Sequence, residues 1–264
     1  MTVHYETDDP VFVITIDRPE VCNAIDRPTA EALADAMRRF DEDPGLSVAV
    51  LTGAGGRFCA GADLKAMNEP GGERVNRVEV NGDGPVGPTR MLLSKPVIAA
   101  IEKLAVAGGL ELACWCDLRI ASADTVFGVY CRRWGIPLMD GGTVRLPRLI
   151  GHSHALDLIL TGRAISGEEA LRMGLVNRLV EPGQTLKAAL ALAHEIAAYP
   201  QAAMRSDRRS SYEQWERQLP DALTREFLHG MSTLHTGETF EGIRQFGAGE
   251  RRYAQVDTGG RLRS

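Results

Sequence analysis

Two turns built from small residues could each present a free backbone N–H group to a negatively charged oxygen. In the first, small residues at 59–62 precede Asp63, a candidate helix cap. In the second, Gly108 and Gly109 open a helix. N–H groups at a helix start have no acceptor within the helix. Two such donors aimed at one oxygen would form an oxyanion hole, where each can contribute about 3–4 kcal/mol. The alternative at both positions is a close-packed turn without a ligand.

Two carboxylates lie next to glycine-containing turns. Glu111 lies one turn inside the second helix, between two leucines, where a lone carboxylate is unusual if that face is buried. The alternative is an exposed glutamate that interacts favourably with the helix dipole. Asp140 lies in a loop directly before two glycines and could approach a ligand. Its alternative role is to cap a turn or helix.

The elements that would position these residues alternate between strand and helix. The β-branched run at residues 11–16 predicts a strand that ends in a turn at Pro19. Asp26 and Pro28 then start an amphipathic helix. Its apolar residues recur at helical spacing: Ala30, Leu33, Ala34, Met37 and Phe40. Residues 48–52 predict an apolar strand, and this alternation is typical of the α/β class.

The alternation continues to about residue 180. Further strands are predicted at residues 97–101, 118–121 and 176–180, and further helices at 108–113, after a capping box of Ser166 and Glu169, and at 186–198. The last of these helices stops at Pro200. Beyond it only helices are predicted, to about residue 247, and residues 257–264 are expected to form a loose tail.

Two glycine-rich segments have different interpretations. Residues 53–56 follow a strand, but a dinucleotide-binding motif would need a third glycine where Phe58 stands, so a tight turn is expected. Residues 68–88 contain five glycines and three prolines without periodicity. A loop of that length is either a functional lid or disordered.

Composition argues against several classes of function. The 264 residues include 30 Lys and Arg against 35 Asp and Glu, and the net charge of −5 argues against a nucleic-acid partner. No apolar stretch is long enough to span a membrane, and the N-terminus does not resemble a signal peptide, so a cytoplasmic protein is expected. Five cysteines without metal-like spacing predict reduced thiols and no metal site.

Six motifs occur in register between about residue 10 and residue 180. They are DRPE at 17–20 with Asn23-Ala24, FCAGADL at 58–64, KPVIAA at 95–100, GGLELA at 108–113 with Cys116-Asp117, Thr161-Gly162, and the stretch from Ala170 to Gly174-Leu175-Val176. Together they resemble the crotonase superfamily, the enoyl-CoA hydratase/isomerase family. The resemblance implies an α/β fold: a spiral of ββα units over residues 1–195 that binds acyl-CoA. A helical oligomerisation region would follow at 196–264 and would give homotrimers or hexamers.

The resemblance also implies roles for individual residues. The N–H groups of Ala62 and Gly108 would form the oxyanion hole for the thioester carbonyl of an acyl-CoA, and Glu111 would be a catalytic carboxylate. Six residues would lie near the substrate or its CoA: Asn23, Ala24, Ala60, Asp63, Leu64 and Lys65. No separate cofactor is implied, because coenzyme A is part of the substrate.

The sequence departs from the hydratase pattern at one catalytic position. Efficient hydratases of the family carry a second glutamate in a Phe-Gly-x-Pro-Glu stretch, whereas here Phe127-Gly128 is followed by Val129-Tyr130-Cys131. A thiol is a weak hydrogen-bonding group with a reference pKa of about 8.5. Asp140 is therefore the candidate second carboxylate. Some relatives with other chemistries, such as naphthoyl-CoA synthases, resemble this chain in having an aspartate before glycines there.

We therefore expect an enoyl-CoA hydratase-like lyase that adds water to a 2-enoyl-CoA. An isomerase is an alternative, because a single base can move a proton between carbons. Two further alternatives are a thioester hydrolase and an acyl-CoA-binding protein that has lost its catalytic activity. Oligomerisation is expected through the region after Pro200, with these apolar contacts: Phe227, Leu228, Met231, Leu234 and Phe240.

Overall fold

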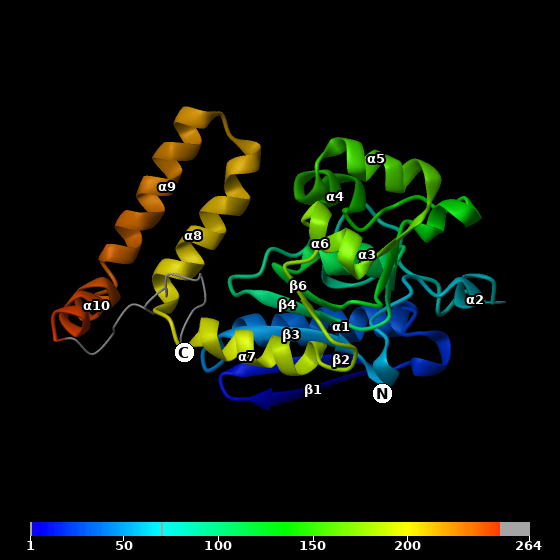
Figure 1. The fold of residues 1–264 in the computed structure, drawn as a ribbon, viewed down its shortest axis with the longest axis horizontal. Coiled ribbons are helices and arrows are strands. Elements are labelled where there is room, and N and C mark those ends of the chain that lie inside the picture. Colours follow the sequence, from blue (N-terminus) through cyan, green and yellow to red (C-terminus); the bar gives the residue numbers. More distant parts are fainter. Residues whose placement is uncertain (1, 70, 249–264) are drawn as a thin grey trace. The chain divides into compact units, whose positions relative to one another are not determined.

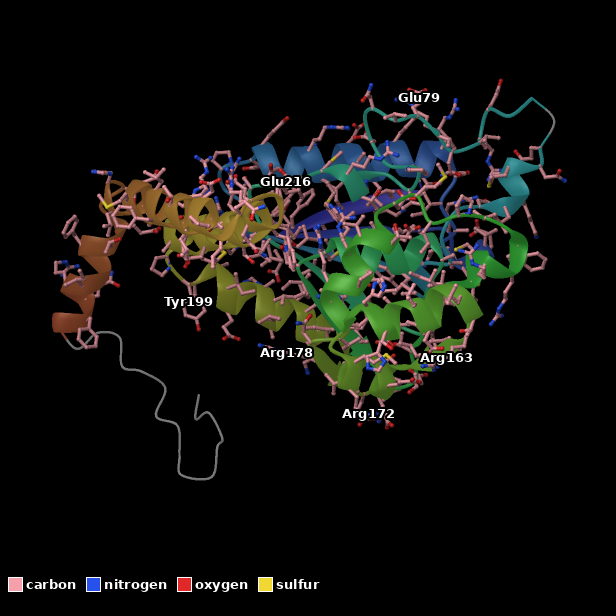
Figure 2. All side chains as sticks on the ribbon, turned by 90° about the horizontal axis from the view of Figure 1, so that it is seen from above. Glu79, Arg163, Arg172, Arg178, Tyr199 and Glu216 are labelled. Atoms are coloured by element: carbon pink, nitrogen blue, oxygen red, sulfur yellow. The ribbon has the colours of Figure 1, made fainter. Side chains whose placement is uncertain are left out.

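The computed structural model describes residues 2–69 and 71–248, and the chain divides after Ala197 into two compact units. The predicted tail at 257–264 lies outside the described residues. The first unit has α/β architecture, as predicted, and contains two sheets (Figure 1). Exposed charged side chains such as Glu79, Arg172 and Arg178 lie on its periphery (Figure 2).

The larger sheet has six strands. In spatial order they are β1 (Val3–Asp8), β2 (Val11–Ile16), β3 (Val48–Gly53), β4 (Val97–Ile101), β6 (Leu118–Ser122) and β9 (Arg178–Val180). The β1–β2 pair is antiparallel, and all other pairs are parallel. The sequence predicted all of these strands except β1, whose exposed polar residues give it little apolar signal.

The inner strands of the large sheet, β2, β3, β4 and β6, are buried on both faces, which explains their continuous apolar runs. In β2, Val11 and Val13 pack in one cluster with α7 (Thr185–Ala197), whereas Phe12, Ile14 and Ile16 belong to the main core on the opposite face. Figure 1 shows α7 running along the sheet. The alternation follows from the two-residue period of a strand.

Helix α1 (Arg27–Glu42) covers the main-core face as the sequence predicts. Asp26 caps it, because Oδ1 of Asp26 accepts hydrogen bonds from the backbone N–H and the hydroxyl of Thr29. Its predicted apolar stripe is buried throughout: Ala30, Leu33, Ala34, Met37 and Phe40.

The smaller sheet lies next to the candidate catalytic helix. It contains β5 (Leu104–Val106), β7 (Val126–Gly128) and β8 (Ala164–Ser166), in that order. These strands have three residues each, too few to show periodicity in the sequence. Helix α3 (Gly108–Trp115) follows β5 directly. All eight of its residues are buried, so Glu111 belongs to the interior and not to the surface.

The remaining helices of the first unit are short. They are η1 (Pro19–Val21), η2 (Ala54–Gly56), α2 (Leu64–Met67), η3 (Pro88–Arg90), η4 (Tyr130–Trp134), α4 (Gly142–Ile150), α5 (His152–Thr161) and α6 (Gly167–Met173). Ser166 caps α6 as predicted, but the Glu169 carboxylate pairs with Arg163 at 2.7 Å. Between α2 and η3, the described residues 68–69 and 71–87 contain no helix or strand.

The second unit is helical over its described part, as predicted. It contains α8 (Gln201–Glu213), η5 (Gln214–Glu216), α9 (Leu219–Leu234) and α10 (Glu238–Gly247). Glu213 joins α8 to α9 through Arg225 and His229. Among the described helices of the whole chain, none is both long and apolar enough to cross a membrane.

Candidate active site

A pocket of about 220 Å³ in the first unit brings the two predicted turns and both predicted carboxylates together. Its walls come from four segments around residues 60–67, 76–86, 106–111 and 130–140. Its lining residues are Ala60, Ala62, Leu64, Met67, Asn76, Val78, Pro85, Val86, Val106, Ala107, Gly108, Glu111, Tyr130, Cys131, Trp134, Ile136, Pro137, Met139 and Asp140. Most of this wall is apolar, so a charge that enters it loses much of its hydration.

The backbones of the two small-residue turns lie in contact with each other. A methyl group built on Gly108 would lie 3.4 Å from the backbone nitrogen of Ala62, and one built on Gly61 would lie 2.7 Å from that of Gly108. Over the described residues, neither the Ala62 nor the Gly108 N–H donates to a protein acceptor. Two unpartnered donors this close together are suited to bind one oxygen.

The start of α3 has strained backbone geometry. Ala107 has a φ of 52°, which is rare for a residue with a Cβ. Gly109 packs so closely on the preceding turn that a Cβ there would lie 2.2 Å from the carbonyl oxygen of Cys59. Strain of this kind persists only where the surrounding structure holds it, and it is frequent at active sites. Here it lies in the pocket wall, at Ala107 and Gly108.

The Glu111 carboxylate is buried and held by the loop that carries Asp140. Its Oε1 accepts hydrogen bonds from the backbone N–H of Asp140 at 2.9 Å and of Gly142 at 2.8 Å. The backbone of Met139 adds a third hydrogen bond to the carboxylate. Burial raises the pKa of Glu111 to about 7, and the nearby Asp140 charge adds to the shift. Near neutral pH this group can therefore both accept and give up a proton.

The Asp140 carboxylate is also held by hydrogen bonds. Its Oδ1 accepts hydrogen bonds from the hydroxyl of Thr89 at 2.5 Å and the N–H of Val86 at 3.1 Å. Burial raises its pKa above the ordinary value, although these hydrogen bonds oppose the shift. The residue does not cap α4, whose N-cap is Gly141 and has no side-chain cap. The helix-capping alternative for Asp140 is therefore wrong.

Cys131 lies in the pocket wall at the start of η4 and is 6% exposed. Burial and the neighbouring Glu111 charge raise the pKa of its thiol, which keeps it protonated and weakly nucleophilic. Tyr130 lies beside it, with the Arg133 guanidinium over its ring at 3.8 Å. The thiol can contact an acyl group but has no group positioned to activate it.

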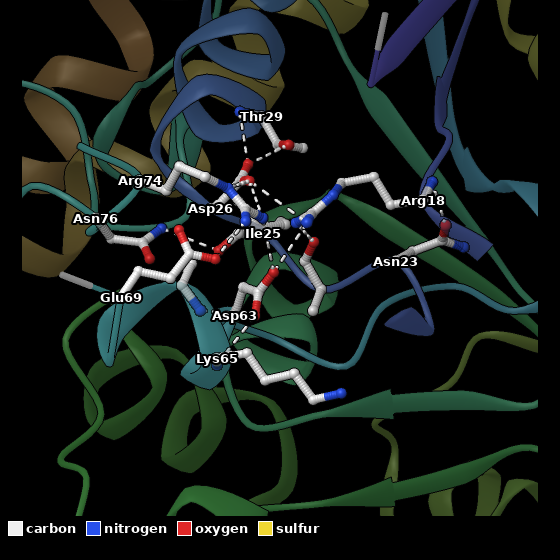
Figure 3. A network of polar contacts seen from close by, with 12 residues as sticks. Arg18, Asn23, Ile25, Asp26, Thr29, Asp63, Lys65, Glu69, Arg74 and Asn76 are labelled. Atoms are coloured by element: carbon white, nitrogen blue, oxygen red, sulfur yellow. Dashed lines mark hydrogen bonds and ion pairs between the residues drawn. The ribbon is translucent and has the colours of Figure 1, made fainter. Parts of the chain in front are cut away.

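Asn23 and Asp63, expected at the CoA site, have structural roles in a buried polar network (Figure 3). Asn23 is fully buried and donates to the carbonyls of residues 54 and 57, while its oxygen accepts from the N–H of Arg18. Asp63 pairs with Arg18 at 2.8 Å and caps α2. The polar groups of both side chains are therefore used within the protein.

The same network holds part of the 68–88 segment. Arg74 pairs with Asp26 at 2.7 Å and with Glu69 at 2.6 Å, and it also reaches Asp63. Burial alone would raise the pKa of Asp26, but hydrogen bonds from Thr29 and Arg74 hold it below the ordinary value. This end of the segment is therefore attached to α1 and α2 by several charged contacts.

The other residues expected near the substrate fall into two groups. Ala60 and Leu64 line the pocket, whereas Ala24 is buried outside it and Lys65 is exposed on α2. The side chain of Lys65 makes no hydrogen bond or ion pair to the described residues. No group of three or more His, Cys, Asp or Glu residues in the described chain could hold a metal ion.

Several pocket residues were not predicted. Asn76 is buried and donates to the carbonyls of Ile25 and Pro85. Val78 and Met67 line the pocket but are exposed. All three residues belong to α2 or to the aperiodic segment after it. A single sequence gives no sign of which loop residues fold over a pocket.

Comparisons with known proteins agree with this geometry. The sequence matches the family model described as enoyl-CoA hydratase/isomerase over residues 6–256. It is 40% identical over 195 residues to the enoyl-CoA hydratase EchA19 of Mycobacterium tuberculosis, with 71% of each chain covered. It is 41% identical over 199 residues to the (E)-benzylidenesuccinyl-CoA hydratase of Thauera aromatica, covering 75% of this chain and 77% of that one. The crystal structure of the enoyl-CoA hydratase EchA1 from Mycobacterium marinum matches with a TM-score of 0.87 at 40% identity, covering 94% of this chain and 96% of that one.

Proposed function

The chain belongs to the enoyl-CoA hydratase/isomerase family and is an acyl-CoA-processing lyase, and on this premise we propose that Glu111 and Asp140 catalyse water addition to a 2-enoyl-CoA. The observation that carries the proposal is the position of both carboxylates in one pocket with two unpartnered N–H groups. The Glu111 carboxylate is held through Oε1 by two backbone N–H groups, and Oδ1 of Asp140 is held while its Oδ2 has no protein donor among the described residues.

The thioester carbonyl would accept hydrogen bonds from the N–H groups of Ala62 and Gly108. Water would add its oxygen to C3 while one carboxylate takes a proton from it, and electron density would move onto the carbonyl oxygen as an enolate. The enolate would then collapse as C2 receives a proton from the other carboxylic acid. The two N–H groups stabilise charge that develops only during the reaction, which is why they accelerate it.

Two carboxylates support hydration over the alternatives. A shift of the double bond needs only one base, so it gives no role to the second buried carboxylate. Thioester hydrolysis through a covalent intermediate needs an activated nucleophile, and the raised pKa of Cys131 argues against that. A protein that only binds acyl-CoA would gain nothing from burying two acids, each of which costs stability when ionised.

We further propose that the acyl group is apolar and larger than crotonyl. Five side chains that line the pocket are also exposed, and they form an apolar rim around its opening: Leu64, Met67, Val78, Trp134 and Met139. A rim of this kind is stabilised when an apolar group covers it. A relative whose name gives it an aromatic substrate, (E)-benzylidenesuccinyl-CoA, supports a bulky acyl group. Lys65 is the proposed contact for a CoA phosphate.

The proposed assembly is a homotrimer or hexamer formed through the second unit. Its helices expose large apolar side chains, including Phe227 at 67% and Phe240 at 68%. The described part of this unit contains a single buried residue, Thr233, so it lacks a core of its own. We also propose a reducing compartment such as the cytoplasm, which fits five free cysteines.

Turnover of purified protein with crotonyl-CoA, cinnamoyl-CoA and a long-chain 2-enoyl-CoA tests the function. Hydration removes the enoyl-thioester absorbance and yields a 3-hydroxyacyl-CoA that mass spectrometry identifies. Formation of a 3-enoyl isomer or of free CoA would instead indicate isomerase or hydrolase activity. Thermal stabilisation by acyl-CoA without turnover of any of the three would indicate a binding protein.

A further inference from the structure

We propose that Thr89 is a positioning residue that fixes the Asp140 carboxylate, so that Oδ1 faces the protein and Oδ2 faces the bound substrate. The proposal rests on the proposed function, because it gives Thr89 its role through Asp140. Thr89 is not among the pocket-lining residues, and no motif in the sequence singles it out. It lies at the end of the aperiodic segment, in η3.

The contact between the two side chains is short and buried. The Thr89 hydroxyl donates to Oδ1 of Asp140 at 2.5 Å, and the residues are 1% and 4% exposed. The N–H of Val86 donates to the same oxygen at 3.1 Å. Oδ1 therefore receives two donors, whereas Oδ2 receives none from the described residues. A carboxylate held at one oxygen in this way cannot rotate without breaking a charge-assisted hydrogen bond.

The backbones that carry these two side chains are also joined. The Arg145 guanidinium donates to the carbonyl oxygen of Asp140 at 3.0 Å and to that of Thr89 at 2.6 Å. A planar fork with several donors suits such a bridge, because it fixes the distance between two acceptors. Thr89 and Asp140 are thus linked once by their side chains and once through Arg145, so the turn at residues 84–90 and the turn at residues 139–142 form one unit.

The space around the contact leaves room for no other partner. A Cβ on Gly84 would lie 2.0 Å from Oγ1 of Thr89 and 2.6 Å from Oδ1 of Asp140. Only a residue without a side chain fits there. The turn at residues 84–90 therefore packs directly against the hydrogen bond between Thr89 and Asp140, which restricts these two side chains to one arrangement. Because catalytic groups must be held within a fraction of an ångström, such support affects rate directly.

Besides the Thr89 hydroxyl, four groups that are charged or can titrate lie close enough to Asp140 to affect its pKa or to have their own pKa affected by it. The Arg90 and Arg145 guanidinium groups favour its ionised form, whereas Glu111 is a neighbouring carboxylate. The fourth is the thiol of Cys59, whose own pKa burial raises to about 12, so it stays neutral. Loss of the Thr89 hydroxyl would remove a hydrogen bond that favours the ionised carboxylate. The pKa of Asp140 would rise further above its ordinary value.

Thr89→Val tests this role, because it keeps the shape of the side chain and removes the hydroxyl. We expect the kcat for hydration of crotonyl-CoA to fall about 10- to 100-fold, with KM nearly unchanged. We also expect the limb of the pH–rate profile that belongs to Asp140 to move to higher pH. Thr89→Ser keeps the donor and should restore both kcat and the profile.

Thr125→Val is the matched control, since Thr125 is equally buried, donates to the carbonyl of Ile101, and lies outside the pocket wall. It should leave the pH–rate profile unchanged even if it lowers stability. Wild-type-like kcat and pH dependence in Thr89→Val, or no rescue by Thr89→Ser, would overturn the proposal. If Asp140→Asn is also fully active, the proposed function of Asp140 is wrong. If Asp140→Asn is impaired while Thr89→Val is not, only the positioning role is wrong.

Discussion

The backbone N–H of Asp140 donates a hydrogen bond to Oε1 of Glu111 over 2.9 Å. The loop that carries one carboxylate therefore holds the other, and a shift of this loop would move both at once. The N–H of Gly142 donates to the same oxygen at 2.8 Å, so the orientation of Glu111 depends on two successive positions of one turn. The acid–base pair is one structural unit, although 29 residues separate its members.

Removal of either carboxylate should lower the rate of hydration by about 10²–10⁴-fold, as is typical for a positioned acid or base. Glu111→Gln and Asp140→Asn keep the shapes of these side chains and remove their proton transfer. Steady-state turnover of crotonyl-CoA measures the effect.

Cys131→Ser is the control for both variants, because it changes another pocket group that has no proposed proton to transfer. It should leave kcat within about 3-fold of the wild type. If Cys131→Ser were inactive and Asp140→Asn were active, the proton transfer that we propose for Asp140 would belong to Cys131 instead.

Glu111 should make stability depend on pH. Its pKa rises from an ordinary value of 4.5 to about 7 on folding, so the folded state retains a proton that the unfolded state has lost. Its favourable contribution is complete below pH 4.5 and is lost as the pH rises to about 7. As the pH rises from about 5 to about 8, the free energy of unfolding of Glu111→Gln should therefore increase by about 2–3 kcal/mol relative to that of the wild type. Urea unfolding of both proteins at the two pH values measures this change. The same stability difference between variant and wild type at both pH values would contradict the prediction.

Gly108→Ala should disrupt the oxyanion hole without unfolding the protein. The new methyl group would lie 3.4 Å from the Ala62 nitrogen and 3.0 Å from Cγ1 of Val86, in the space that the thioester oxygen needs. We expect kcat/KM to fall about 10²–10³-fold, the effect of losing one donor. Gly230→Ala is the control, because no atom lies within 4 Å of the added group. Full activity of Gly108→Ala would show that the thioester binds elsewhere.

Trp134→Ala should change the preference for the acyl group. Trp134 lines the pocket and is 71% exposed, so its ring is available to a long or aromatic acyl chain. We expect kcat/KM to fall about 10-fold for cinnamoyl-CoA, equivalent to about 1.4 kcal/mol of apolar contact. Crotonyl-CoA is too short to reach the rim and should be hydrated as before. Equal losses for both substrates would argue against an acyl contact.

Charge in the apolar surface of the second unit should weaken oligomerisation. Phe227→Glu together with Phe240→Glu places two carboxylates where we expect apolar contacts, and sedimentation velocity should show smaller species. Leu160→Glu is the control, because Leu160 is 71% exposed but lies in the first unit. Dissociation by Leu160→Glu alone would place the contact in the first unit.

The sequence predicted best those parts of the fold that repeat over several residues. The apolar stripe of α1 and the β-branched run of β2 have periods that burial enforces, so the start of α1 and both limits of β2 were found to within a residue. The sequence did not predict the strands β5, β7 and β8, because three residues are too few to show the two-residue alternation of a strand.

The residues of the candidate site also differ in how well the sequence predicts them. Glu111 and Gly108 belong to a local motif, GGLELA at 108–113, so the sequence identifies them directly. Thr89 and Asn76 matter only because an aperiodic segment folds back on residues far away in the chain. Asn23 is a recognisable motif residue whose side chain holds a turn together, a structural role that the motif alone did not predict.

Cys131 and Asp140 line the same pocket from different segments, one on η4 and one before α4. A carboxylate introduced at either position would thus enter the same volume, near the same pair of backbone donors. During evolution an acidic group could therefore be exchanged between these two loops by single substitutions, without rebuilding the scaffold. Related enzymes could then carry their second acid on either of the two loops and retain a common reaction centre. Their sequences would show one functional group transferred between neighbouring loops.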